Sequence, residues 1–338
     1  MEKRKLMALG KSSLVIAIPK HWMKKNDLNR GDYVSLNVRN DGSLNVYPGT
    51  EVKKERKITL SFNEKEEGNS IARHIISCYL NGYTTIQLLS KNVFTAGQHG
   101  AIRSVVKTLY MRIMEANSRK ITINTMLDES MGSLKSGIER MNLITCSMCS
   151  DTLESIKNWD KDLAQSIVSL EDDVDQFCFL HLRLIRMASQ DSALARDLEI
   201  NILDCLDCQT LVHRIEQVAD HITNIASRFI ILFDTKILLS KDALKIIMRM
   251  AEIAFDSYYK ATEAFLSKNT DETNEIIDKQ KEMERLREEM TPLLYGKMAK
   301  NNLFTCNLCS IIESVDRISE CAADIAELAI DRTYNLQS

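Results

Sequence analysis

From residue 128 to the end of the chain, hydrophobic and polar positions follow the period of an α-helix almost without interruption. This part contains only one proline and three glycines. Interruptions divide it into six helices, three within about 130–233 and three within about 240–336. They lie near residues 158–160, 189–192, 234–240, 269–272 and 297–302. We therefore predict an all-α tandem of two three-helix bundles, residues 128–236 and 237–338.

The last helix of each bundle carries three polar side chains at intervals of four residues. The two sets match at an offset of 100, and the preceding helices match at about 109, which indicates an internal repeat. The matched pairs are Glu216 and Asp316, Asp220 and Glu320, and Asn224 and Asp324. Each set lies on one helical face, where like charges four residues apart repel each other. The doubled row indicates either a cation site or a solvated acidic face.

Residues 51–127 alternate between strand and helix patterns after a charged linker at 51–57. The expected elements are a strand at 57–62, a helix at 66–80, a strand at 84–90, a helix at 96–114 and a strand at 120–126. This order predicts a βαβαβ module with right-handed crossovers. The module has neither a Gly-rich phosphate loop nor a nucleophile motif, so we expect it to connect or dimerise.

Residues 1–50 contain short predicted strands. An apolar stretch at 13–18 ends at Pro19, and a short helix at about 21–26 follows. After a turn at 29–32, strands at 33–38 and 44–47 are expected to pair across a hairpin turn at 40–43. The segment has too few apolar side chains to bury a core alone, so we expect a second copy of the chain to complete it.

Charge is distributed unevenly along the chain. Residues 1–57 contain 13 Lys and Arg against 6 Asp and Glu, a net charge of +7, so the remainder carries −10. A basic end favours an anionic partner such as nucleic acid, although it could instead pack against the acidic body. The 338-residue chain is 44% hydrophobic and 27% charged, typical of a soluble globular protein of two or three domains. We expect no membrane span and no signal peptide, and reduced cysteines in the cytoplasm.

The N-terminal motifs resemble the AbrB/MazE-like swapped-hairpin (SpoVT-AbrB) domain. The matching residues are the stretch 10–20 with Pro19, the motif at 28–32 with Gly31-Asp32, and the turn at 41–44. The resemblance implies that two chains interleave their hairpins and that basic residues of the first strand and loop meet DNA. The implied DNA-facing residues are Lys3, Arg4, Lys5, Lys11 and the adjoining Ser12. Many family members have basic residues where Ser12 and Ser13 stand, so dimerisation without DNA binding is the alternative.

The helical tandem resembles the PhoU family of phosphate-uptake regulators. Its motif reads DRISECAADIAE at 316–327, with a looser partner, EQVADHITNIA, at 216–226. The resemblance implies metal ions held on the bundle surface by Glu/Asp-x-x-x-Asp motifs. In the first repeat the middle helix adds Glu171 and Asp175, which implies a site built on Glu171, Asp175, Glu216 and Asp220.

The corresponding stretch of the second repeat departs from this pattern. Gln280 stands where an acid is expected and Lys281 adds a positive charge, so a second metal site is less favoured. The full set of implied metal ligands is Glu171, Asp175, Glu216, Asp220, Asn224, Glu284, Asp316, Glu320 and Asp324. Carboxylate oxygens suit a divalent or trivalent ion such as Fe, Mn, Mg or Zn. His213 and His221 are expected to be surface or capping residues.

Three CxxC pairs fall within predicted helices: Cys146 and Cys149, Cys205 and Cys208, and Cys306 and Cys309. Zinc and iron–sulfur sites usually lie on turns with Gly or Pro nearby, which these pairs lack. We expect buried thiols, with a thiol-ligated metal or a redox pair as the alternative.

These patterns together predict a non-catalytic regulator of phosphate uptake: a DNA-binding homodimer that regulates transcription, with a metal-binding sensor or partner domain. The alternative is an adaptor that binds a phosphate ABC transporter or a sensor kinase and uses its N-terminal domain for dimerisation only. A carboxylate-metal enzyme is disfavoured, because such bundles usually need a His three residues after a Glu. Ala219 and Ser319 occupy those positions here.

Overall fold

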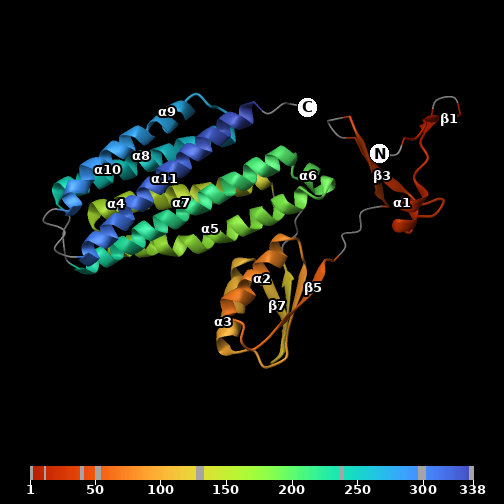
Figure 1. The fold of residues 1–338 in the computed structure, drawn as a ribbon, viewed down its shortest axis with the longest axis horizontal. Helices are drawn as coiled ribbons and strands as arrows, with labels where there is room; N and C mark the ends of the chain where they lie inside the picture. Colours follow the sequence, from red (N-terminus) through yellow and green to blue (C-terminus); the bar gives the residue numbers. More distant parts are fainter. Residues whose placement is uncertain are drawn as a thin grey trace. The chain divides into compact units, whose positions relative to one another are not determined.

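In a computed structural model of the chain, the described residues are 3–10, 13–38, 42–49, 55–126, 133–235, 240–295 and 302–334. The chain divides into two compact units, and the boundary lies between Lys54 and Glu55. The first unit is the N-terminal segment. The second contains the α/β module and the long helices (Figure 1).

The N-terminal unit consists of two pairs of antiparallel strands and one short helix. The pairs are β1 (Met7–Leu9) with β2 (Ser13–Val15), and β3 (Val34–Val38) with β4 (Leu44–Pro48). The helix α1 (Lys20–Lys25) begins directly after Pro19, as predicted. In the predicted turn at 29–32, the backbone N–H of Asn29 donates to the Asp32 carboxylate (2.6 Å) and Gly31 has a φ of +102°. Residues 40 and 41 of the predicted hairpin turn lie outside the described residues.

Large apolar side chains of the N-terminal unit are exposed. None of its described residues is buried. Leu14 is 68% exposed, Val38 is 72% exposed and Tyr33 is 83% exposed. Because two-stranded sheets are marginal without a covering layer, this unit lacks a core of its own among the described residues.

The α/β module is a four-stranded sheet with two helices on one face. Its elements are β5 (Lys57–Phe62), α2 (Gly68–Leu80), β6 (Thr85–Ser90), α3 (Ala96–Thr108), β7 (Met111–Ala116) and β8 (Lys120–Thr125). The strand order is β5-β6-β8-β7; β5 and β6 are parallel, and β8 is antiparallel to both of its neighbours. Alternate residues of the strands, such as Ile86 and Ile123, face α2 and α3 in a compact core.

The predicted helix over residues 96–114 is wrong beyond Thr108, and the predicted βαβαβ order becomes βαβαββ. Residues 111–116 read MRIMEA, which are mostly good helix formers, yet they pair with β8. Tyr110 takes a left-handed conformation (φ +49°) and turns the chain. The Asn117 side chain accepts hydrogen bonds from the N–H groups of Arg119 and Lys120 and closes the hairpin. Pairing with a neighbouring strand therefore overrides local helix propensity.

The helical part contains the six predicted long helices and two short additional ones. The first repeat comprises α4 (Leu134–Asn158), α5 (Lys161–Ala188) and α7 (Ile202–Thr235), and the second comprises α8 (Lys241–Ser267), α10 (Gln280–Tyr295) and α11 (Asn302–Thr333). The short helices are α6 (Ser192–Asp197) and α9 (Thr273–Asp278). Asp160 caps α5 and Ser240 caps α8, which accounts for two of the predicted breaks. None of the described helices is apolar over a stretch long enough to cross a membrane.

The two repeats pack around one shared hydrophobic core. Figure 1 shows α11 beside α8 of its own repeat and α7 of the other repeat. Arg214 of α7 pairs with Asp324 of α11, and Asn224 of α7 donates to Ser314 of α11. These contacts run in opposite directions along the two helices, so α7 and α11 are antiparallel. At the offset of 100 residues Arg214 corresponds to Ser314 and Asn224 corresponds to Asp324, so each contact is the counterpart of the other. The helix pair α7 and α11 therefore has a local pseudo-twofold symmetry.

Two arginines of α5 anchor the α/β module. Buried Arg183 donates to the carbonyl oxygens of Tyr79 and Tyr83, and its guanidinium lies 4.8 Å from the centroid of the Tyr79 ring. Arg186 donates to the Asn81 side chain (3.0 Å). Since Tyr79 lies in the last turn of α2, the Arg183 cation also meets the negative end of that helix.

Candidate metal centre

The candidate metal centre lies where α5 and α7 pack side by side. Glu171 and Asp175 are one turn apart on α5, and Glu216 and Asp220 are one turn apart on α7. Residues four apart share a helical face, so packing the two helices brings the two pairs of acids together.

Three of these acids form a close group. Asp175, Glu216 and Asp220 each offer one oxygen, and these oxygens lie within 4.8 Å of one another. Asp175 and Glu216 are half-buried and Asp220 is exposed. Glu171 is half-buried and near enough to Asp220 and Asp175 for their charges to act on it. The structure thus brings together the first-repeat acids that the PhoU resemblance implied.

Burial and mutual repulsion make this group costly to ionise. Burial, followed by the charges of Asp220, Asp175 and Glu171, raises the pKa of Glu216 to about 7. Burial and the charges of Asp220 and Asp172 raise the pKa of Asp175 to about 6. Burial also raises the pKa of Glu171 and of Asp220. A divalent cation would relieve this repulsion, and clustered carboxylate oxygens are the donors that such ions take. The residues therefore fit a metal ion.

Asn224 continues the row along α7 but contacts a different partner. Its amide donates to the hydroxyl oxygens of Ser314 (2.7 Å) and Ser310 (3.1 Å) on α11. Its carbonyl oxygen accepts a hydrogen bond from Arg228 (3.1 Å). Asn224 thus links the two repeats and is not in the close carboxylate group.

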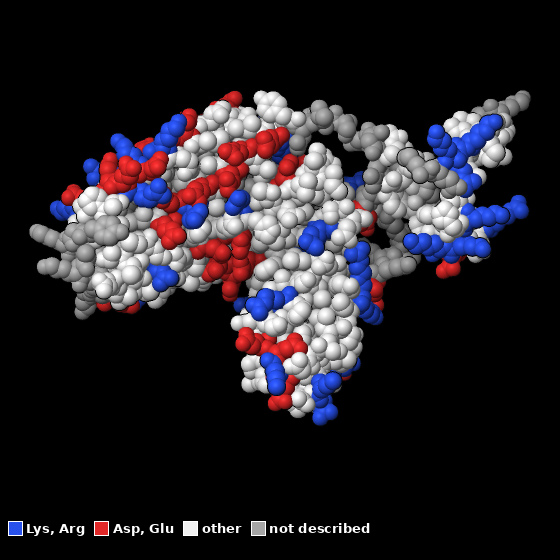
Figure 2. All heavy atoms as spheres, in the orientation of Figure 1, with Lys and Arg blue, Asp and Glu red and all other residues white. Residues whose placement is uncertain are grey.

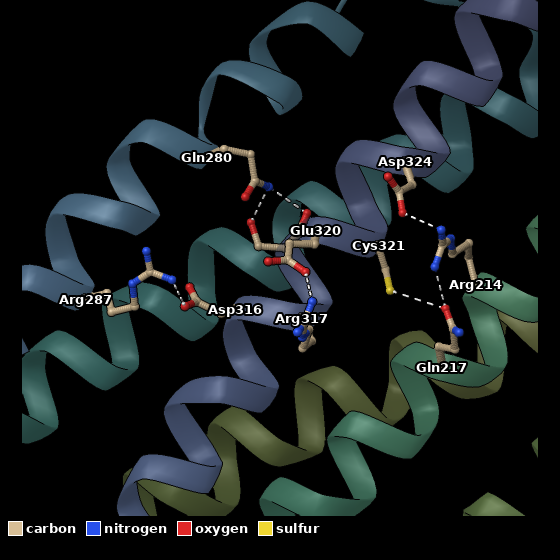
Figure 3. Close-up of polar contacts among 10 residues, drawn as sticks. Arg214, Gln217, Gln280, Arg287, Asp316, Arg317, Glu320, Cys321 and Asp324 are labelled. Carbon is tan, nitrogen blue, oxygen red and sulfur yellow. Dashed lines mark hydrogen bonds and ion pairs between the residues drawn. The ribbon is translucent and has the colours of Figure 1, made fainter.

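In the second repeat the corresponding acids are paired with arginines (Figure 3). Asp316 pairs with Arg287 of α10 (3.0 Å), and Glu320 pairs with Arg317 of its own helix (2.6 Å). The third acid, Asp324, pairs with Arg214 of α7 (2.7 Å).

The other second-repeat candidates do not join these acids. Gln280, which replaces an acid, donates to the backbone and hydroxyl oxygens of Ser319 (2.7 and 2.8 Å). Glu284 is exposed on α10. Among the described residues, only the first-repeat group brings three potential metal ligands together.

Sequence reasoning missed two residues of these sites. Arg287 neutralises Asp316, and the buried thiol of Cys178 lies on the α5 face that carries Asp175. The offset of 109 residues that aligns Glu171 with Gln280 also aligns Cys178 with Arg287. This alignment of the two repeats is the sequence feature that could have identified Arg287 and Cys178.

The cysteine pairs lie on helices as predicted, and all nine cysteines are free. Cys149, Cys205 and Cys208 are buried and Cys146 is half-buried. The expectation of buried thiols is wrong for Cys306 and Cys309, because both are exposed in the first turns of α11. Neither His213, which is exposed, nor half-buried His221 belongs to the close carboxylate group.

The described DNA-binding candidates lie before the first strand. Lys3, Arg4 and Lys5 are exposed and precede β1. Lys11 and Ser12 lie outside the described residues. The structure adds three exposed lysines on α1, namely Lys20, Lys24 and Lys25. Their recurrence on one short predicted helix could have identified them.

Comparison with known proteins places the helical tandem in a family. A family model described as the PhoU domain matches residues 138–229 and 247–329, together just over half of the chain. The phosphate-specific transport system accessory protein PhoU homolog of Zymomonas mobilis is 24% identical over 204 residues, which are 60% of this chain and 84% of the relative. The family model covers the two repeats and not the N-terminal unit, so the AbrB/MazE-like character of that unit stays a prediction.

A crystal structure of a PhoU protein has a similar fold. PhoU from Pseudomonas aeruginosa superposes with a TM-score of 0.52 at 20% identity, covering 60% of this chain and 95% of that one. PhoU from Streptococcus pneumoniae, a phosphate transport system regulatory protein, gives a TM-score of 0.49 at 15% identity, covering 61% and 95%. Because the family model matches just over half of the chain, the chain belongs to the PhoU domain family of phosphate-transport regulators, which are not enzymes.

Proposed function

We propose that this chain is a cytoplasmic, DNA-binding regulator of phosphate uptake that acts as a homodimer and holds a metal ion in its first repeat. The observation that carries the proposal is a basic N-terminal unit, with no buried side chain among its described residues, on the same chain as a PhoU-family tandem. In this proposal the chain has four functional parts: a swapped-hairpin domain at 1–50, a connecting module at 51–127, and bundles at 128–236 and 237–338.

Dimerisation is supported by the exposed apolar side chains of the N-terminal unit. Leu14, Leu36 and Val38 lie on strands of two-stranded sheets and are each more than 60% exposed. A second copy would cover these side chains and add strands to both sheets. This is the arrangement that the AbrB/MazE-like resemblance implies.

DNA binding is supported by the charge of the same unit. Lys and Arg side chains gather on it, whereas acidic side chains form rows on the helical unit (Figure 2). Lys3, Arg4 and Lys5, together with the α1 lysines, provide cations for phosphate contacts. Two copies would double this charge on one duplex.

A metal ion at Asp175, Glu216 and Asp220 would link α5 to α7 by neutralising their carboxylates. Since α5 also anchors the α/β module through Arg183, the ion would stabilise the helix that joins the module to the tandem. The remaining surface of the tandem would dock a phosphate transporter or its sensor kinase.

The first experiment is a pull-down of sheared genomic DNA from the source cell by the full-length protein, followed by sequencing of the bound fragments. We expect enrichment upstream of phosphate-transport genes, with an affinity that falls steeply as salt rises. A matched pair of variants tests the contact residues. Lys3→Glu, Arg4→Glu and Lys5→Glu together should abolish binding, whereas Lys65→Glu, Lys91→Glu and Lys107→Glu should not.

The second candidate function is a PhoU-like adaptor whose N-terminal unit only dimerises. A folded dimer that enriches no DNA at low salt would favour the adaptor and contradict the regulator. Deleting residues 1–50 separates the two, because an adaptor would retain its protein partner while losing its dimer.

A further inference from the structure

The candidate metal centre has a sulfur atom beside its carboxylates. Glu171, Asp175 and Cys178 follow one another on α5 at spacings of four and three residues, which places them on one helical face. Cys178 is only 4% exposed, so its thiol lies deeper than the half-buried carboxylate of Asp175. A metal ion seated among the acids would therefore have a buried thiol on its inner side.

The second repeat indicates which side chain of α7 lies opposite the position of Cys178 on α5. At the offset of 109 residues Cys178 corresponds to Arg287, and at the offset of 100 residues Glu216 corresponds to Asp316. Arg287 and Asp316 form an ion pair of 3.0 Å. The equivalent side chains of the first repeat, Cys178 and Glu216, lie near enough for the charge of Glu216 to act on the Cys178 thiol, although a cysteine is shorter than an arginine.

The charges around the two positions differ in a way that points to a ligand. In the second repeat the three acids meet Arg287, Arg317 and Arg214. Over the described ranges of the chain, no Lys or Arg nitrogen lies within 4.0 Å of the Asp175, Glu216 or Asp220 carboxylates. Burial and the charges of Glu216, Asp175 and Asp220 raise the pKa of the Cys178 thiol, which agrees with its position beside the carboxylates. Where the second repeat has Arg287, the first repeat thus has a thiol, and its three close carboxylates have no Lys or Arg partner among the described residues.

We propose that Cys178 is a thiolate ligand of the metal ion held by Asp175, Glu216 and Asp220, and that it makes the site select Zn²⁺, Fe²⁺ or Co²⁺ over Mg²⁺ and Ca²⁺. This inference rests on the metal site of the proposed function. The sulfur is not part of the group within 4.8 Å, so ligation requires the Cys178 side chain to turn toward the carboxylates. The S–H bond is replaced by a metal–sulfur bond, and one proton passes to solvent. Sulfur ligands favour borderline and soft ions, whereas Mg²⁺ and Ca²⁺ require oxygen.

Titration of the metal-free, full-length protein with Co²⁺ tests this assignment directly. We expect a thiolate-to-cobalt charge-transfer band in the near ultraviolet for the wild type. Cys178→Ser should still bind Co²⁺ through the carboxylates but lack the band, and its Zn²⁺ affinity should fall about tenfold or more, or at least about 1.4 kcal/mol. Its Mg²⁺ affinity should stay within about twofold of the wild type, since oxygen ligands alone hold that ion. Cys208→Ser, which removes a buried thiol elsewhere on α7, should retain the band.

Each other outcome has a defined meaning. Co²⁺ that binds the wild type without a charge-transfer band would overturn the role of Cys178 and leave the carboxylate site standing. No Co²⁺ or Zn²⁺ retained on equilibrium dialysis would overturn the metal site itself. If Cys178→Ser is unfolded by circular dichroism, Cys178→Ala replaces it. If both variants are unfolded, the presence or absence of the band in the wild type decides.

Discussion

The two repeats of the helical unit carry corresponding rows of acids but balance their charges differently. In the first repeat Asp175, Glu216 and Asp220 converge and repel one another, and burial raises their pKa values. In the second repeat each acid of the row has an arginine at 3.0 Å or less. A duplicated fold can thus retain an acidic face in both copies while only one copy pairs each acid of its row with an arginine.

The largest expected effect distinguishes the two rows by metal binding. Glu216→Gln together with Asp220→Asn removes two of the three close carboxylates, so the affinity for Zn²⁺ or Mn²⁺ should fall about 100-fold or more. The matched control, Asp316→Asn together with Glu320→Gln, alters the corresponding pair of the second repeat and should leave the affinity unchanged. Isothermal titration of metal-free protein measures both. Equal losses in the two variants would contradict the proposed difference between the repeats.

A graft tests whether Arg287 keeps the second repeat from binding a metal ion. Gln280→Glu and Arg287→Cys together restore the acid and the thiol of the first repeat and remove the guanidinium beside Asp316. We expect a second metal ion per chain by elemental analysis after gel filtration. Arg287→Met alone is the control, since it removes the charge without supplying a ligand. An unchanged metal content in the graft would mean that other groups, such as Arg317, are sufficient to exclude the ion.

The stability of the metal-free protein should depend on pH through the first repeat. The folded-state pKa values of Glu216 (about 7) and Asp175 (about 6) exceed their ordinary values, so the folded form holds these protons more tightly than the unfolded form. Their stabilisation is complete below about pH 4 and is lost as pH rises through 6 to 7. The thermal midpoint should therefore fall over that range, and less so with saturating metal.

The contribution of this cluster must be separated from that of buried His181. Burial lowers the pKa of His181 to about 4, so His181 contributes stability at neutral pH that is lost as pH falls. The difference between the wild type and Glu216→Gln isolates the cluster, because His181 is present in both. A difference that does not change between pH 5 and pH 8 would contradict the raised pKa of Glu216.

The smallest expected effect concerns the ion pair of the second repeat. Arg287→Met leaves Asp316, whose side chain is 15% exposed, without its partner, and should lower the free energy of unfolding by about 1 kcal/mol. Arg285→Met, on the same helix, removes only an exposed contact of 3.9 Å with Glu289 and should cost about 0.3 kcal/mol or less. Urea unfolding at constant salt measures both. A cost for Arg287→Met no greater than for Arg285→Met would mean that the pair is not stabilising.

Local signals in the sequence were sufficient to predict the long helices and most of the strands. The breaks at Asp160 and Ser240 were predictable because capping side chains act within three residues along the chain. The strand at Lys57–Phe62 was predicted with its observed bounds because its alternation and flanking residues are also local. The helical periodicity predicted which acids share a face of a helix, because residues four apart along a helix lie on the same face.

Only the tertiary structure decided which side chains and elements contact those faces. Residues 111–116 favour a helix locally and become a strand because β8 lies beside them. Cys306 and Cys309 follow the helical pattern and are exposed because no neighbouring element covers them within the described part of the chain. Glu216 and Asp316 occupy equivalent positions, yet Glu216 meets carboxylates from α5, whereas Asp316 meets an arginine from α10. The sequence by itself determined most of the elements and the doubled row of polar side chains, because these depend on near neighbours in the chain. The charge balance of each row depends on residues that only folding brings together.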